Sequence, residues 1–391
     1  MQALLLASAS IPLYVWARHQ LGTAPAALFQ AAFLGFWGVL AGNVFDFHAT
    51  AFATPIVALA LYALLTRRYR LLIATVVVGL LVRENVALTF AAIGVYVALV
   101  QRRWRLGGAI AAVSLAWFLV VIRAVLPAIS GRSYEHWYYG TLGSGPAEAL
   151  RTLITDPIDS AKLFFTPHVK RVALFNLFAP WLFLPLVSPL LIVMLPSLAE
   201  RFFADRPEFW AQGFHYSLVI APILAFAAVD TIARIRRYVD PKRAAALTLG
   251  LAAATVIAGA YFSFGRLRPL DELGRYTSAD HAAAIRDCLE RVPSSASVAA
   301  TSALVPHLSR RSEIYLLDNR PVPPTEFLAI DTYTWMFPLT IADVRRLVET
   351  SYARGYGVVC TSPGTVVLAR GAVSRRLDPQ LARQLGIGSG A

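Results

Sequence analysis

Residues 43–85 read NVFDFHATAFATPIVALALYALLTRRYRLLIATVVVGLLVREN. Two long apolar runs in this stretch, at 51–65 and 71–82, are separated by a basic turn at 67–70. Charged residues and histidine lie only at the ends of these runs. A charge near membrane depth costs about 2.5–3.5 kcal/mol, and such residues are usually retained for a site or a packing partner. The stretch therefore predicts membrane helices with a polar site at one side of the bilayer.

The composition of the whole chain supports a membrane protein. Of the 391 residues, 57% are hydrophobic and only 15% are charged, whereas soluble domains carry roughly 25% charged residues. The net charge of +13 by itself suggests nucleic acid as a partner. However, the arginines cluster at the ends of apolar runs, which is typical of cytoplasmic anchors. We therefore expect membrane lipids, and no nucleic acid, as partners.

The basic clusters also predict the topology. Under the positive-inside rule, four clusters are expected in the cytoplasm: 18–19, 67–70, 102–105 and 234–243. The sequence then predicts a polytopic α-helical protein of the cytoplasmic (inner) membrane, with about ten membrane segments. Two runs, 71–82 and 86–100, are shorter than the roughly 20 residues of a full span. We expect them to form a short helical hairpin whose tip, Arg83-Glu84, faces outward.

The domain organisation follows from a change in composition. Residues 1–263 are predicted to form the multi-pass transmembrane helical domain, with an external loop at 128–171. Alternating strand and helix patterns over 264–371 predict a small extracytoplasmic α/β domain. Residues 372–391 are basic and predict a flexible tail.

The chain has two cysteines, Cys288 and Cys360. They are able to pair if the C-terminal domain lies outside the cell. One is expected in a helix and the other in a strand, which argues against pairing and leaves the question open.

Several segments carry a family resemblance: IPLYVWARHQLG, the start of the stretch quoted above, LLVRENVALTFAAIGVYVAL and LPLVSPLLIVMLPSLAE. They resemble a family of bacterial and archaeal predicted membrane proteins of unknown function. That family is similar to the C-superfamily glycosyltransferases, integral membrane enzymes that use polyprenyl-phosphate sugars as donors. The resemblance implies a lipid-linked-sugar glycosyltransferase at the outer face of the membrane, with a glycan or protein acceptor.

Two departures from the family pattern bear on this expectation. Family members usually begin with an additional helix and an external acidic motif, so we expect this chain to start after that point and to be incomplete for activity. In addition, Asn85 stands where an aspartate is common.

The candidate site residues follow from the chemistry of glycosyl transfer. A carboxylate must take the proton of the acceptor, and a cation or metal must neutralise the phosphate leaving group. Asp46 and Glu84 are the candidate catalytic carboxylates. The candidate substrate-binding residues are basic or aromatic: His48, Arg83, His215, Tyr216, Trp137 and Tyr138. A divalent metal remains open as a cofactor, although the sequence shows no strict ligand spacing.

Other interpretations of the same residues remain open. Arg83 and Glu84 could be paired structurally at helix ends, and the aromatic residues could lie in the headgroup belt. A transporter or flippase of lipid-linked substrates would use polar residues within its helices. A non-catalytic envelope or assembly protein is the third class.

Overall fold

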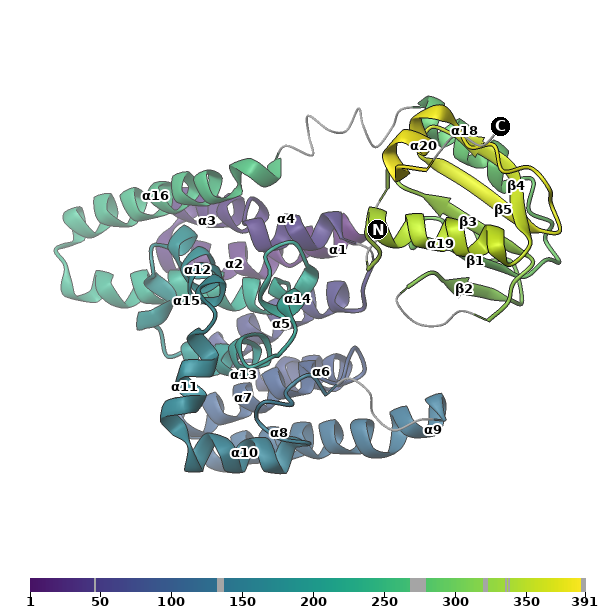
Figure 1. Ribbon diagram of the computed structural model, residues 1–391. Helices are drawn as coiled ribbons and strands as arrows, with labels where there is room; N and C mark the ends of the chain where they lie inside the picture. Colours follow the sequence, from purple (N-terminus) through teal and green to yellow (C-terminus); the bar gives the residue numbers. More distant parts are fainter. Residues whose placement is uncertain are drawn as a thin grey trace. The chain divides into compact units, whose positions relative to one another are not determined.

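The computed structural model describes residues 1–45, 47–131, 137–267, 279–318, 323–334, 336 and 338–387. The chain forms two compact units, Met1–Arg268 and Pro269–Ala391. The first unit is built from helices and the second contains a small sheet (Figure 1). The expected combination of a helical part and a C-terminal α/β part is therefore present.

The first unit consists of helices, most of them short. Their bounds are α1 (Gln2–Ser8), α2 (Ser10–Leu21), α3 (Thr23–Leu34), α4 (Trp37–Val44), α5 (Thr50–Leu65), α6 (Tyr69–Leu80), α7 (Val86–Leu99), α8 (Trp104–Val120), α9 (Leu126–Ser130), α10 (Pro146–Thr155), α11 (Pro157–Phe165), α12 (His168–Phe178), α13 (Leu191–Phe202), α14 (Pro207–Trp210), α15 (Ile220–Ile235) and α16 (Pro241–Leu267). A π-helical segment, Val121–Val125, joins α8 to α9.

Among the described residues, three stretches are long and apolar enough to cross a membrane: Trp104–Ser130, His215–Tyr238 and Pro241–Phe264. The pair α3 and α4, bent by 43°, would add a fourth. Helices α5, α6 and α7 are apolar but shorter. A helix of 12 residues is about 18 Å long, against a hydrocarbon core of roughly 30 Å. The described chain thus holds three or four clear spans, and the count of about ten segments stays a prediction.

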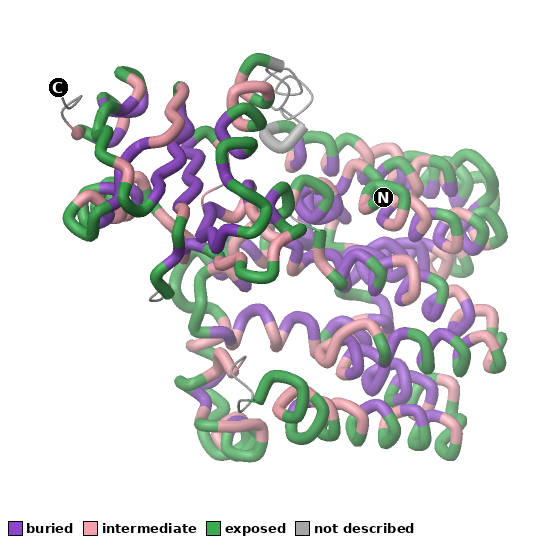
Figure 2. Tube along the Cα trace, turned by 90° about the vertical axis from the view of Figure 1, so that its right-hand side faces the viewer, coloured by how far each residue is buried: buried purple, intermediate pink, exposed green. Residues whose placement is uncertain are grey.

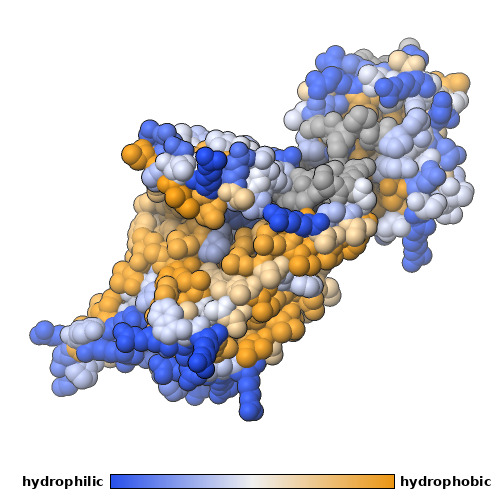
Figure 3. All heavy atoms as spheres, turned by 90° about the horizontal axis from the view of Figure 1, so that it is seen from below, coloured by the Kyte–Doolittle hydropathy of each residue, from blue (hydrophilic) through white to orange (hydrophobic). Residues whose placement is uncertain are grey.

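A band of exposed apolar side chains surrounds part of the first unit. Figure 3 shows this hydrophobic surface between hydrophilic margins. Val77 of α6, Val113 of α8 and Ile257 of α16 belong to the exposed large apolar residues. In contrast, α15 is buried from Ile220 to Ile232. Exposed apolar surface around one buried helix is typical of a bundle whose outer faces contact lipid.

Close packing holds α8 against the hairpin of α6 and α7. A Cβ atom on Gly94 would collide with the backbone of Ala111, and one on Gly107 with the backbone of Ala98. Small residues of this kind let two membrane helices approach closely. The indole Nε1 of Trp117 also donates to the carbonyl of Leu80, at 2.8 Å. These contacts place α8 beside the hairpin tip that carries Arg83 and Glu84.

The second unit contains α18 (Ala279–Leu289), β1 (Val298–Ala300), β2 (Ile314–Leu316), β3 (Phe327–Asp331), α19 (Ile341–Ala353), β4 (Tyr356–Ser362), β5 (Thr365–Arg370) and α20 (Pro379–Leu385). The strand order in the sheet is β2-β1-β3-β5-β4. Strand β1 is parallel to β2 and β3, whereas β5 is antiparallel to β3 and β4. Most residues of the strands are buried (Figure 2), because helices cover both faces of the sheet.

The two cysteines form a disulfide, so the argument against pairing was wrong. Cys288 of α18 is bonded to Cys360 of β4, and their Cα atoms are 5.3 Å apart. Helix α18 packs on the sheet face that includes Val298, Ala300 and Val367. A helix and a strand in different parts of the sequence can therefore bring two cysteines together, which their secondary structure alone does not reveal.

The end of the chain is also more ordered than predicted. Within the expected flexible tail, α20 packs against the sheet and α19, and it buries Leu377, Leu381 and Leu385. The Asp378 side chain caps this helix by accepting from the backbone N–H groups of Gln380 and Leu381. The prediction rested on the basic composition and overlooked a short amphipathic helix with an aspartate N-cap.

Candidate functional site

The tip of the α6–α7 hairpin carries three polar residues in succession. The Arg83 guanidinium donates to Thr50 Oγ1 at 3.3 Å, and its Nε lies 3.7 Å from Glu84 Oε1. Asn85 Nδ2 donates to Glu200 Oε1 at 2.6 Å. The hairpin tip is therefore tied to the start of α5 on one side and to the end of α13 on the other.

Glu200 and Arg201, at the end of α13, are two site residues that sequence reasoning missed. Arg201 is buried and donates to the Phe209 carbonyl and to Ser217 Oγ, both at 3.0 Å. Burial raises the pKa of the Glu200 carboxyl, while the positive charge of Arg83 and the hydrogen bond from Asn85 lower it. The signal available in the sequence was an acidic-basic pair at the end of an apolar run, like the one at Arg83-Glu84.

The structure stacks two of the candidate histidines. The rings of His48 and His215 lie 3.9 Å apart with an interplanar angle of 19°. His215 is buried, and within the described part of the chain neither of its ring nitrogens has a hydrogen-bond partner. Tyr216 stacks on Phe209 with ring centroids 4.4 Å apart. A buried ring nitrogen without a hydrogen-bond partner lowers the stability of the fold. A polar ligand could supply that partner, so His215 is suited to binding one.

The aromatic segment after residue 136 lies over the end of α13. Tyr139 donates its hydroxyl to the Glu200 carbonyl at 3.1 Å, and the backbone N–H of Asp205 donates to the Tyr138 carbonyl at 2.8 Å. The Arg206 guanidinium lies 4.2 Å from the ring centre of Tyr138. Trp137 donates its indole N–H to the Gly143 carbonyl at 2.7 Å. These contacts hold the segment that carries both predicted aromatic residues at the end of α13.

These groups meet at a cavity of about 500 Å³. One part of its lining is polar and is formed by Arg83, Glu84, Asn85 and Glu200. The remaining walls are mainly apolar or aromatic and come from α8, the aromatic segment, α10 and α13: Leu115, Phe118, Leu119, Trp137, Tyr138, Leu150, Leu153, Pro196 and Phe203. Phe209 also lines the cavity and stacks on Tyr216, which connects the cavity to the two histidines. Arg83 is close enough to His215 and Tyr216 to act on both electrostatically.

Most of the predicted site residues are thus brought together. Arg83, Glu84, Trp137 and Tyr138 line the cavity, and His48, His215 and Tyr216 lie beside it. The second candidate carboxylate, Asp46, lies outside the described residues. Among those that are described, no three His, Cys, Asp or Glu side chains are placed to hold a metal ion.

The chain matches one family of proteins. The sequence model of the family described as Predicted membrane protein (DUF2079) matches residues 1–343. The chain belongs to this family. The earlier resemblance to predicted membrane proteins of unknown function is therefore confirmed, and the apolar helices agree with it. In this DUF2079 protein, the matched residues include the whole lining of the cavity. No curated protein and no solved structure matches the chain.

Proposed function

We propose that this DUF2079 protein binds a lipid-linked sugar phosphate in the cavity and transfers its sugar to a glycan or protein acceptor. The observation that carries the proposal is the composition of the cavity lining. Apolar walls from α8, α10 and α13 join a polar part with Arg83 and Glu84. A polyprenyl-phosphate sugar has the same two parts, because an apolar chain is attached to a charged and hydroxylated head. Sites of this kind combine apolar walls with a few placed polar groups.

The proposed reaction uses the residues at the polar part of the cavity. The Glu84 carboxylate takes the proton of an acceptor hydroxyl while that oxygen bonds to the anomeric carbon of the sugar. The bond between the anomeric carbon and the phosphate oxygen breaks, and polyprenyl phosphate leaves. Arg83 stabilises the negative charge on the departing phosphate. His48 and His215 supply further contacts to the phosphate, and Trp137 and Tyr138 stack on the sugar.

We further propose that the site and the C-terminal unit face the outside of the cytoplasmic membrane. The stretches His215–Tyr238 and Pro241–Phe264 are successive candidate spans, and arginine and lysine residues flank the turn that joins them. Such a turn favours the cytoplasm, which puts His215 and the end of α16 at the opposite face. The Cys288–Cys360 disulfide supports this orientation, because disulfides persist mainly in oxidising compartments.

Binding of a lipid phosphate to the purified protein tests the proposed ligand. We expect native mass spectrometry to show retention of polyprenyl phosphate, and weaker retention of the corresponding polyprenol without phosphate. Leu119→Trp places a large ring in the cavity wall, so it should weaken binding by at least about tenfold, or 1.4 kcal/mol.

The matched control is Val120→Trp, because Val120 is the next residue of α8 and its exposed side chain does not line the cavity. This variant should bind like the wild type. Equal binding by the two variants, or equal retention of phosphate and alcohol, would refute the proposed ligand.

A further inference from the structure

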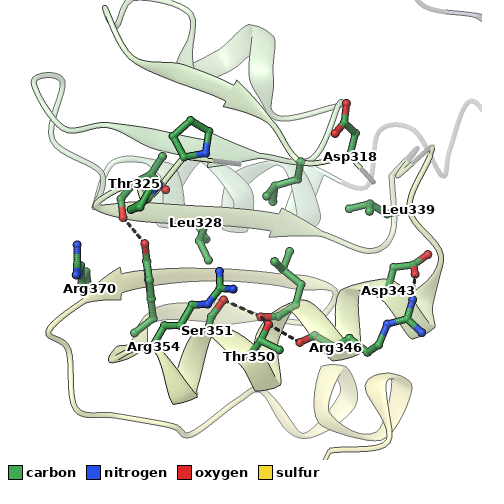
Figure 4. A pocket seen from close by; sticks show the side chains of 15 residues that line it. Asp318, Thr325, Leu328, Leu339, Asp343, Arg346, Thr350, Ser351, Arg354 and Arg370 are labelled. Atoms are coloured by element: carbon green, nitrogen blue, oxygen red, sulfur yellow. Dashed lines mark hydrogen bonds and ion pairs between the residues drawn. The ribbon is translucent and has the colours of Figure 1, made fainter. Parts of the chain in front are cut away.

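The C-terminal unit contains a second, larger cavity that takes no part in the proposed transfer. It is a groove of about 860 Å³ along one side of α19. Leu328 of β3, Tyr356 of β4 and Leu347 of α19 line it, together with Leu317 and Leu339. Figure 4 shows α19 along one wall and the strand with Leu328 along the other. The groove therefore has an apolar floor between a helix and the sheet.

Charged side chains of both signs line this groove. Arg346, Arg354 and Arg370 line it, as do the carboxylates of Asp318 and Asp343. Arg346 forms an ion pair with Asp343, and Figure 4 shows this pair away from Arg354 and Arg370. Neither Arg354 nor Arg370 forms an ion pair within the described part of the chain. One end of the groove thus presents two guanidinium groups that are available to an anion.

Three threonine and serine residues that line the same groove carry hydroxyl groups. Thr325 Oγ1 donates to the Phe327 carbonyl at 2.8 Å, and Thr350 Oγ1 donates to the Arg346 carbonyl at 2.7 Å. Ser351 Oγ donates to the Leu347 carbonyl at 2.6 Å. Thr325 and Ser351 are buried, whereas Thr350 is exposed, so Thr350 is the hydroxyl that a ligand can reach. Its proton is donated to the backbone and its lone pairs can accept, so a suitable ligand must itself carry donors, as the hydroxyl groups of a sugar do.

We propose that this groove binds an anionic saccharide. Its carboxylate or phosphate group is held by Arg354 and Arg370, and one of its hydroxyls donates to Thr350. The apolar floor formed by Leu328 and Tyr356 meets the C–H face of a sugar ring. A neutral sugar would leave the two arginines without a partner, and a simple inorganic anion would leave the floor uncovered. The site belongs to a separate unit, so it does not depend on sugar transfer in the membrane unit.

Calorimetric titration of the full chain in detergent tests this proposal with three probes. These are a trigalacturonate, a maltotriose bearing one phosphate, and unmodified maltotriose. We expect saturable binding of at least one anionic probe, and the better of the two identifies the anion as carboxylate or phosphate. The neutral trisaccharide should bind at least about tenfold more weakly, because it cannot form charge-assisted hydrogen bonds with the two arginines.

Variants then locate the binding. The double variant Arg354→Gln/Arg370→Gln should weaken anionic binding by at least about tenfold, and Arg354→Lys/Arg370→Lys should retain part of it. Both arginines are exposed, so these variants should unfold at the same temperature as the wild type. The control Arg345→Gln removes one charge from the same helix, where Arg345 pairs with Glu349 outside the groove. It should bind normally.

Several results would overturn the inference. These are the absence of saturable binding of both anionic probes, equal binding of the neutral probe, and unchanged binding by the glutamine double variant. Tighter binding of tri-glutamate than of either anionic sugar would also overturn it, because the groove would then be a peptide site.

Discussion

Removing the disulfide between Cys288 and Cys360 is expected to lower the free energy of unfolding of the C-terminal unit by about 4 kcal/mol. The bond joins residues that are 72 positions apart in the sequence. In the chain-entropy description, a cross-link that closes a long loop restricts the unfolded chain strongly and thereby favours folding. The bond also fixes α18 to β4 across one face of the sheet. The double variant Cys288→Ala/Cys360→Ala should therefore unfold at a much lower denaturant concentration.

Pulse proteolysis of the full chain in increasing urea measures this change, because the C-terminal unit becomes cleavable as it unfolds. Val358→Ala serves as a comparison, since it truncates a buried residue of β4 without affecting the bond. Its expected cost is smaller, at about 1–3 kcal/mol. A loss below about 1 kcal/mol in the double cysteine variant would show that the bond contributes little. Free thiols at both cysteines in intact cells would contradict the external location of this unit.

The second large effect is expected for Glu84→Gln, which should lower sugar transfer by at least about 100-fold. The substitution keeps the shape of the side chain but removes the negative charge and the ability to take a proton. Glu84 lies 3.7 Å from Arg83, which is too long for a hydrogen bond. A loose pair of this kind contributes about 1 kcal/mol or less. Protein yield and thermal stability should therefore stay close to those of the wild type.

Transfer can be measured with a panel of polyprenyl-phosphate sugars and compared with binding of polyprenyl phosphate. Asp159→Asn is the control, because it removes a carboxylate from α11 whose side chain is 77% exposed. A fall of about 3–5 kcal/mol in the stability of Glu84→Gln would instead indicate a buried structural pair. If the protein binds the lipid but transfers no sugar from the panel, even when the family's additional helix and acidic motif are supplied, a transporter or an assembly protein replaces the enzyme as the better account.

Much of the fold could be predicted where local chemistry decides it. Within the stretch predicted as a loop at 128–171, α10 and α11 each begin at a proline, which is a local signal for the start of a helix. The strands and helices predicted by the alternating patterns over 264–371 are present in the structure, because alternation and amphipathic spacing are local signals. The disulfide and α20 could not be predicted in this way. Both depend on which surfaces meet in the folded unit.

In the candidate site, too, local patterns predicted some residues and could not predict others. Arg83, Glu84 and His48 were predicted because charged residues and histidine are rare beside apolar runs. Glu200 forms an acidic-basic pair with Arg201 at the end of an apolar run, but its contact with the hairpin tip joins residues far apart in the sequence. Asn85 is 115 positions from Glu200, and it binds the Glu200 carboxylate. No local pattern reveals such a pair, and the cavity exists only when α8, α10 and α13 come together around it.

Photo-crosslinking with a polyprenyl-phosphate analogue tests the central claim most directly, namely that the cavity holds a lipid phosphate. The analogue carries its reactive group in the apolar chain, and the labelled residues are identified by mass spectrometry. We predict labelling of the cavity walls at Leu115, Leu150 and Pro196, and protection by an excess of unlabelled polyprenyl phosphate. Labelling spread over the outward-facing residues Val77 and Ile257, without such protection, would contradict the account.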